Sequence, residues 1–228
     1  MKAKTRMCIG LAGMLIVGVI FQLTLEKSFA SEHFFGDIVR NAEANPEDLT
    51  AQAALAREYN RRGEYGKALS VAKDILEASP GFPAAIIERA HSHRFLGEFQ
   101  KSVEWYRRYL GTNPNSLEGW GGLSESLARL EIWDESFGAA RAAIGAAPQN
   151  SEGYGALGRA YRFAGRYEEA ADLLQQGLRF APENATLLYD LGVCFVELDD
   201  RPAALVQYDK LLFVNQRSAE ALFSLIFP

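Results

Sequence analysis

Five prolines recur every 34 residues along most of the chain: Pro46, Pro80, Pro114, Pro148 and Pro182. Proline lacks an amide hydrogen and its ring clashes with the preceding helical turn, so each proline marks the end of a helical segment. A fixed period of this length is typical of an array of equal repeats. The spacing therefore predicts an all-α chain built from stacked helical units.

Two columns of small residues come into register when the units are aligned on these prolines. The columns are Ala56, Ala90, Ser124, Gly158 and Gly192, and then Ala68, Ser102, Ser136, Ala170 and Ala204. Small side chains at a fixed position are expected where two helices approach closely. Between the columns stand Gly63, Gly97 and Gly165, and glycine adopts the left-handed conformation of a helix cap without a steric clash. Units three and five carry Glu131 and Asp199 there instead. Each unit is therefore predicted to be a helix, a turn and a second helix.

These columns resemble the tetratricopeptide repeat family. The fourth unit agrees best, through Tyr154, Leu157, Gly158, Tyr161, Gly165, Tyr167, Ala170 and Pro182. About five units follow the pattern, over residues 49–218. The resemblance implies a right-handed superhelical solenoid in which the first helix of each unit lines the concave side.

Residues outside the five units are expected to cover the ends of the array, because a solenoid needs caps over its terminal apolar faces. Residues 31–48 are predicted to form a leading helix. Residues 219–228 begin a sixth unit, and three interpretations stay open: a short docked cap, a surface for self-association, or the remnant of a truncated chain.

The first 30 residues differ in kind from the rest. Lys2, Lys4 and Arg6 precede an uninterrupted run of apolar residues and glycine over residues 7–21. This pattern predicts either a signal peptide cleaved after Ala30 or an uncleaved membrane anchor. Because positive charge stays inside, both alternatives place the repeats outside the cytoplasm, in the periplasm or anchored at the inner membrane.

The charge of the chain argues against a nucleic-acid partner. The net charge is −5 at pH 7, and the basic residues near the start lie ahead of the repeats, which are more acidic still. Such a body is a poor general binder of nucleic acid or anionic lipid. Contact with a membrane is expected only through the N-terminal segment.

The chemical motifs in the sequence have structural explanations. Gly153, Gly155 and Gly158 match a dinucleotide-binding string, but no predicted strand precedes them. His91 and His93 stand two residues apart, which places them on different faces of a helix. Cys194 has no basic neighbour in sequence and is expected to be a buried thiol. The sequence predicts no catalytic site, no metal site and no cofactor.

The predicted binding surface is the concave groove. Its candidate residues are Arg57, Asn60, Arg61, Ile87, His91, Arg94, Gly121, Glu125, Arg129, Gly155, Arg159, Arg162 and Tyr189. Arginine recurs in units one to four, and guanidinium groups bind carboxylates in a bidentate fork, which favours a partner with an acidic or C-terminal carboxylate segment. The alternative is that these arginines pair with Glu118, Glu125 and Glu152 on neighbouring helices.

Two glycines in this groove stand out, because glycine weakens a helix by about 1 kcal/mol relative to alanine. Gly121 and Gly155 are predicted to leave a bare floor on which a partner's backbone lies closely. The alternative is that neighbouring helices simply tolerate them.

These observations predict a non-catalytic scaffold that holds a protein or peptide partner. The lysine and asparagine clamp by which some relatives bind chaperone C-termini is absent from the corresponding columns. Exported arrays of this size resemble assembly factors of pili, secretion systems and cytochrome maturation, which suggests assembly of an envelope complex. The alternative function is an accessory or regulatory subunit of an envelope enzyme, such as one acting on cell-wall polymers.

Overall fold

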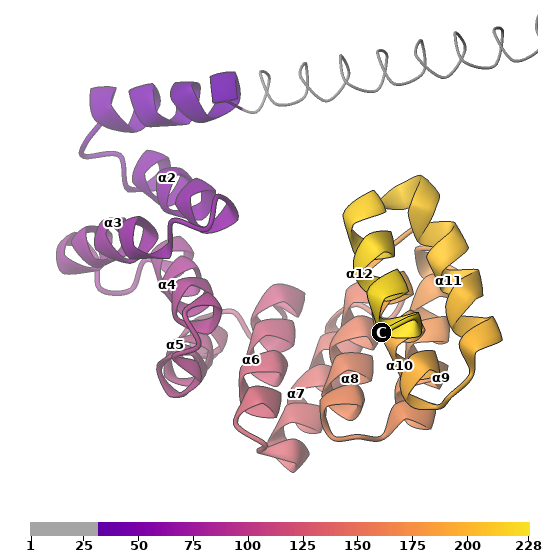
Figure 1. The fold of residues 1–228 in the computed structure, drawn as a ribbon. Coiled ribbons are helices and arrows are strands. Elements are labelled where there is room, and N and C mark those ends of the chain that lie inside the picture. Colours follow the sequence, from indigo (N-terminus) through magenta and orange to yellow (C-terminus); the bar gives the residue numbers. More distant parts are fainter. Residues whose placement is uncertain (1–31) are drawn as a thin grey trace, which may run out of the picture.

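The computed structural model describes residues 32–228, which form helices and turns and contain no strand. The predicted signal peptide or anchor over residues 1–30 lies outside this part of the chain. A leading helical segment covers residues 32–44. The helices that follow are α2 (Leu49–Arg61), α3 (Tyr65–Ala78), α4 (Pro83–Phe95), α5 (Phe99–Thr112), α6 (Leu117–Arg129), α7 (Trp133–Ala146), α8 (Ser151–Phe163), α9 (Tyr167–Phe180), α10 (Ala185–Glu197), α11 (Arg201–Val214) and α12 (Gln216–Ile226). The predicted all-α repeat solenoid is confirmed (Figure 1).

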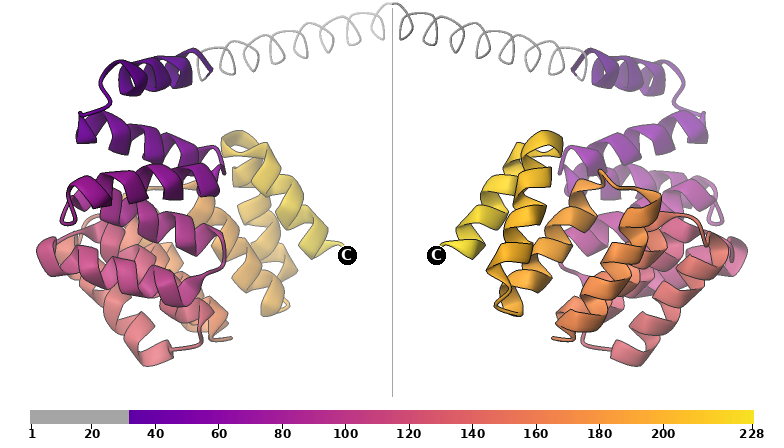
Figure 2. Two further views of the ribbon diagram at one scale, coloured as in Figure 1. Left: turned by 90° about the vertical axis from the view of Figure 1, so that its left-hand side faces the viewer. Right: turned by 90° about the vertical axis from the view of Figure 1, so that its right-hand side faces the viewer.

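Five helix–turn–helix units run from α2 to α11, and their first helices line the inside of the curve. Each of α2, α4, α6, α8 and α10 contacts the next first helix, whereas within residues 49–214 no second helix contacts the next second helix. When the first helices touch one another and the second helices stay apart, the array bends toward the side of the first helices. The chain therefore curves around an open inner face (Figures 1 and 2).

The prolines and the residues that follow them explain where the first helices begin. Each proline stands two positions before a cap residue, and four of these caps are polar. Asp48 accepts the amide hydrogen of Thr50 at 2.9 Å, and Asn184 accepts that of Thr186 at 3.0 Å. Such side chains satisfy amides that have no partner within the helix. Proline and cap together set the start of each repeat.

The turns inside the units adopt the left-handed conformation in all five repeats. Gly63, Gly97 and Gly165 have φ angles of 77°, 76° and 73°. Glu131 and Asp199 take the same conformation with φ angles of 60° and 58°, although a side chain disfavours it. The turn geometry is thus imposed by the packing of the two helices and does not require glycine.

The two columns of small residues lie where the helices of a unit meet. Every alanine and serine in them is 0% exposed. In unit three, Ser136 donates a hydrogen bond to the carbonyl oxygen of Ser124 at 2.8 Å. In unit four, a Cβ atom on Gly158 would lie 2.8 Å from Leu174. Larger side chains at these positions would push the helices apart.

Both ends of the described array are covered by additional helices. The leading segment packs on α2, where the rings of Phe35 and Tyr59 lie 5.9 Å apart and Glu32 pairs with Arg62 at 2.8 Å. At the other end α12 buries Ala219, Leu222 and Ile226 against α10 and α11. The opposite side of α12 exposes Phe223, Leu225 and Phe227. No helix within residues 32–228 is both long enough and apolar enough to cross a membrane.

The turn geometry predicts opposite effects for the same substitution at two glycines with open space around them. Gly97 has a positive φ angle, whereas Gly138 lies inside α7, and neither has a neighbouring atom that an added Cβ would meet within 4 Å. Gly97→Ala should lower the free energy of unfolding by about 1 kcal/mol, because alanine is strained there. Gly138→Ala should raise it by about 0.5–1 kcal/mol, because alanine favours the helix. Urea unfolding followed by circular dichroism measures both, and equal signs would contradict the turn assignment.

Candidate partner-binding groove

Three adjoining hollows follow the inner face of the array. The leading hollow, about 310 Å³, lies between the leading segment and α2 and is lined by Phe34, Ile38 and Ala53. The middle hollow, about 410 Å³, lies over α2 and α4, and the central hollow, about 380 Å³, lies over α4, α6, α8 and the start of α10. The leading and middle hollows share Arg57 and Arg61, and the middle and central hollows share His91, Phe95 and Glu118. Each hollow therefore borders the next along the inner face, and the three hollows together are called the groove.

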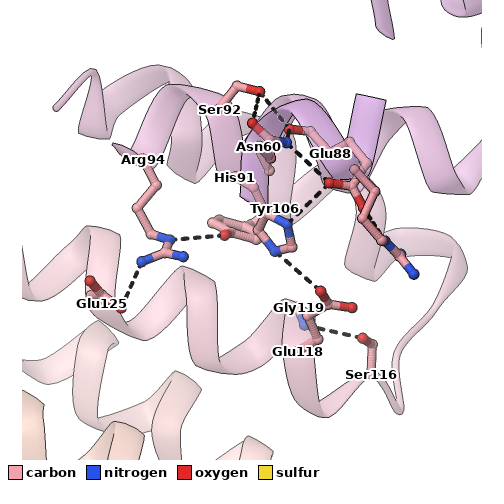
Figure 3. Close-up of polar contacts among 12 residues, drawn as sticks. Asn60, Glu88, His91, Ser92, Arg94, Tyr106, Ser116, Glu118, Gly119 and Glu125 are labelled. Atoms are coloured by element: carbon pink, nitrogen blue, oxygen red, sulfur yellow. Dashed lines mark hydrogen bonds and ion pairs between the residues drawn. The ribbon is translucent and has the colours of Figure 1, made fainter. Parts of the chain in front are cut away.

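A buried glutamate organises the middle hollow. Glu88 is 1% exposed and accepts hydrogen bonds from Arg57 at 2.6 Å and from the side-chain amide of Asn60 at 3.0 Å (Figure 3). Ser92 donates to the other end of the Asn60 amide at 2.7 Å. His91 approaches Glu88 at 3.7 Å and Glu118 at 3.5 Å, so the ring lies between two carboxylates. This network joins units one, two and three.

The partners of Glu88 determine its charge. Burial would raise the pKa of Glu88, but contacts from His91, Arg57 and Asn60 outweigh this effect, and its pKa lies below its ordinary value. The glutamate is therefore ionised in the folded protein and stabilises the junction between α2 and α4.

Arg94 joins the second and third units in a similar way. Its guanidinium pairs with Glu125 at 2.9 Å and donates to the hydroxyl of Tyr106 at 3.2 Å (Figure 3). Tyr106 is fully buried, and burial raises its pKa. The hydroxyl therefore stays protonated and accepts the hydrogen bond from Arg94 as a neutral group.

Two arginines share one buried aspartate between the fourth and fifth units. Asp190 is 3% exposed and lies 3.5 Å from Arg159 and 3.2 Å from Arg162. Burial raises the pKa of Asp190, while the two arginines act in the opposite direction. Arg57 with Glu88, Arg94 with Glu125 and Arg159 with Asp190 are each 31 residues apart, and in each case an arginine meets an acid of the next unit. Arg57 and Arg159 occupy the same repeat position, whereas Arg94 lies three positions further along its unit.

The groove contains most, but not all, of the residues predicted for it. Eight line the middle or central hollow: Arg57, Asn60, Arg61, His91, Arg94, Gly121, Glu125 and Arg159. Arg162 pairs with Asp190 and does not line any of these three hollows, and Tyr189 packs against the apolar cluster of the last unit. Arg129 forms no ion pair with a described residue and lies 5.4 Å and 5.2 Å from the ring centres of Phe99 and Phe163.

Two predicted groove positions lie in the packed interior. Ile87 is 2% exposed and packs in the core of unit two, so a partner cannot reach it. Gly155 does not leave a bare floor, because a Cβ atom there would lie 2.6 Å from the side chain of Leu187. Gly121 does: an added Cβ atom would meet only the Cβ of Ala156, at 4.0 Å. Of the two glycines, one serves close packing and one opens the groove.

Most of the groove arginines form ion pairs within the chain. Arg57, Arg94, Arg159 and Arg162 pair with acids of the next unit, as the alternative to a free ladder required, whereas Arg61 pairs with Glu58 of its own helix at 2.9 Å. Among the acids predicted as their partners, Glu125 alone serves that role, and the other two partners are Glu88 and Asp190. The 31-residue spacing was the signal in the sequence that could have identified both.

The thiol and the second histidine singled out in the sequence are both buried. Cys194 is 0% exposed, and burial raises the pKa of its thiol to about 12. His93 is buried beside Glu98, and burial lowers its pKa. Within residues 32–228 no group of three or more histidine, cysteine, aspartate or glutamate side chains is placed to hold a metal ion.

Comparison with known proteins identifies the family. Two family models described as tetratricopeptide repeat match residues 87–151 and 164–225, which together are more than half of the chain. The chain belongs to the tetratricopeptide repeat family. Proteins of this family are in general non-catalytic scaffolds for protein–protein interaction. No curated protein sequence is significantly similar to this chain.

Solved structures share the fold at low sequence identity. TTC0263, a thermophilic TPR protein of Thermus thermophilus, is 19% identical, with a TM-score of 0.73 over 79% of this chain and 100% of that one. A tetratricopeptide repeat protein from Parabacteroides merdae is 17% identical, with a TM-score of 0.69 over 88% of this chain and 83% of that one. YrrB, described as a TPR protein with an unusual peptide-binding site, is 17% identical, with a TM-score of 0.52 over 82% of this chain and 97% of that one.

The network around Glu88 predicts a pH-dependent contribution to stability. Glu88→Gln should lower the free energy of unfolding at pH 7 by about 1–3 kcal/mol, because Arg57 and Asn60 lose an ionised partner. The folded-state pKa of Glu88 lies below its ordinary value of 4.5, so this stabilisation is present above about pH 4.5 and is lost as the pH falls through the folded-state pKa. The difference between wild type and variant should therefore shrink in acid.

Urea unfolding at pH 7 and at about pH 3.5 measures this difference. The matched control is Glu104→Gln, which removes an exposed carboxylate on α5 and should have an effect below about 0.5 kcal/mol. A deficit of the Glu88 variant that is equal at both pH values would contradict the role assigned to its charge.

Proposed function

We propose that this chain is a non-catalytic scaffold that binds an extended polypeptide segment along its concave groove. The observation that carries the proposal is the row of three hollows, each bordering the next, from the leading segment to the start of α10. A groove that crosses several repeats offers successive contacts to a chain laid along it. A single enclosed pocket is the form expected for a small molecule.

The character of the groove changes along its length. The leading hollow is lined mainly by apolar side chains, including Phe34 and Ile38, whereas the middle hollow is lined by Arg57, Asn60 and Glu88. The central hollow mixes charged groups with the half-exposed ring of Phe95. This sequence of surfaces can distinguish one segment from another by its order of apolar and polar residues. The peptide-binding site for which YrrB is described supports a groove ligand of this kind.

We further propose that the scaffold acts outside the cytoplasm, in assembly of an envelope complex. The support is the basic start and the apolar run over residues 7–21, which has the composition of an export signal or anchor. An alkaline phosphatase domain fused after Pro228 tests the location, since this enzyme is active only after export. Activity that depends on residues 1–30 supports the proposal, and an inactive, stable fusion would refute it.

Groove binding is tested by one substitution made on two faces of the same repeat. Gly121 lies on the groove side of α6, whereas Gly138 lies exposed on α7 of the same unit, and an added Cβ has room at both. Gly121→Leu should fill the floor of the central hollow, and Gly138→Leu should leave the groove unchanged. Both variants should fold, since leucine favours a helix more than glycine does.

The measurement uses peptides of about 12 residues selected from a random display library for binding to the full chain. The affinity of groove ligands should fall at least tenfold, about 1.4 kcal/mol, in the Gly121→Leu variant and stay within twofold in the Gly138→Leu variant. Equal affinity for both variants would place the binding surface elsewhere.

A further inference from the structure

Most of the charge in the central hollow is neutralised from within the chain. Arg94 pairs with Glu125 at 2.9 Å, and Arg159 lies 3.5 Å from the buried Asp190. Both guanidinium groups are therefore committed to holding neighbouring repeats together. An acidic partner would have to compete with these carboxylates for the same arginines, which disfavours the acidic segment that the arginine column first suggested.

Two carboxylates at the rim of this hollow are not neutralised in the same way. Glu118 in α6 is 51% exposed on its side chain, and its ion-pair contact within residues 32–228 is with the ring of His91, at 3.5 Å. Glu152 in α8 is exposed and forms no ion pair with any described residue. Both side chains line the central hollow. Arg159 and Arg162 exceed Asp190 by one positive charge, whereas Glu118 and Glu152 add two negative charges, so the hollow keeps a net negative charge.

The junction between units three and four differs from the other junctions. Ion pairs between residues 31 apart join units one and two, two and three, and four and five, but within residues 32–228 no ion pair joins units three and four. In unit three Glu125 stands at the repeat position of Arg57 and Arg159, and in unit four Ala156 stands at the position of Glu88 and Asp190. This junction therefore lacks both members of the pair, and Gly121, one turn before Glu125, adds no side chain there.

The space above Gly121 remains open. An added Cβ atom there would meet only the Cβ of Ala156, at 4.0 Å, and Gly121 forms part of the floor of the central hollow. The ring of Phe95 and the side chain of Leu187 line the same hollow and offer apolar contact to an aliphatic stem. The open floor at Gly121, the apolar walls and the two rim carboxylates together fit a long side chain that ends in a cation.

We propose that the partner segment inserts a lysine or arginine side chain over Gly121, where its cation pairs with Glu152 and Glu118. This inference rests on the proposed function, because it names the chemistry of the segment that the groove binds. The incoming cation brings positive charge to the junction between units three and four, which has no inter-unit ion pair within residues 32–228.

The test uses the full chain and display-selected peptides of about 12 residues that lose affinity for the Gly121→Leu variant. We expect these peptides to share a lysine or arginine. Replacing that residue with glutamine in a synthetic peptide should weaken binding to the wild type about tenfold. In the double variant Glu118→Gln, Glu152→Gln the same replacement should cost less than twofold.

The control is the double variant Glu104→Gln, Glu168→Gln, which removes the same charge from two exposed positions on the second helices α5 and α9. It should retain the tenfold effect. The inference would be overturned, with groove binding intact, by either of two results. One is that the groove-dependent peptides lack a basic residue. The other is that replacing the basic residue weakens binding to the Glu118→Gln, Glu152→Gln variant as much as it weakens binding to the wild type. If the selected peptides instead bind the Gly121→Leu variant and the wild type with equal affinity, the proposed function itself is refuted.

Discussion

The close approach of the two helices in each unit is the constraint on which the rest of the structure depends. It requires a small residue in both helices at the contact, and these residues are fully buried wherever they are alanine or serine. With the helices that close, the turn between them must be tight, and units three and five adopt the left-handed conformation at Glu131 and Asp199 despite their side chains. The strain at these two residues is offset by the packing that they permit. Repeating this unit every 34 residues produces the curved array and its inner face.

Charge then determines how successive units are joined on that inner face. Glu88 and Asp190 are almost completely buried, and each is held by arginine from the preceding unit. Burying a carboxylate costs free energy unless its partners are well placed. These contacts therefore stabilise one alignment of neighbouring first helices relative to others. The same arginines that line the groove are therefore also structural. The junction between units three and four lacks such a pair, and this is where the central hollow opens.

The sequence predicts the array well because its signals are local and repeated. Prolines, small columns and turn glycines each report on one helix end or one helix contact, and five copies average out single departures such as Glu131. The groove is harder to predict, because it depends on contacts between units. Gly121 and Gly155 occupy the same column, yet one faces open space and the other faces Leu187. Nor does helical periodicity distinguish an arginine free for a ligand from one paired with a buried acid of the next repeat. Glu88 and Asp190 become recognisable only when residues 31 apart are compared.

The central claim is that the concave face binds the partner, and the location of a bound peptide tests it most directly. Amide chemical shifts of the isotope-labelled full chain, followed by NMR during titration with a display-selected peptide, report that location residue by residue. The account predicts that the largest changes fall in α4, α6 and α8, with α5, α7 and α9 nearly unaffected. Changes concentrated in the second helices, or on the exposed apolar side of α12, would contradict it.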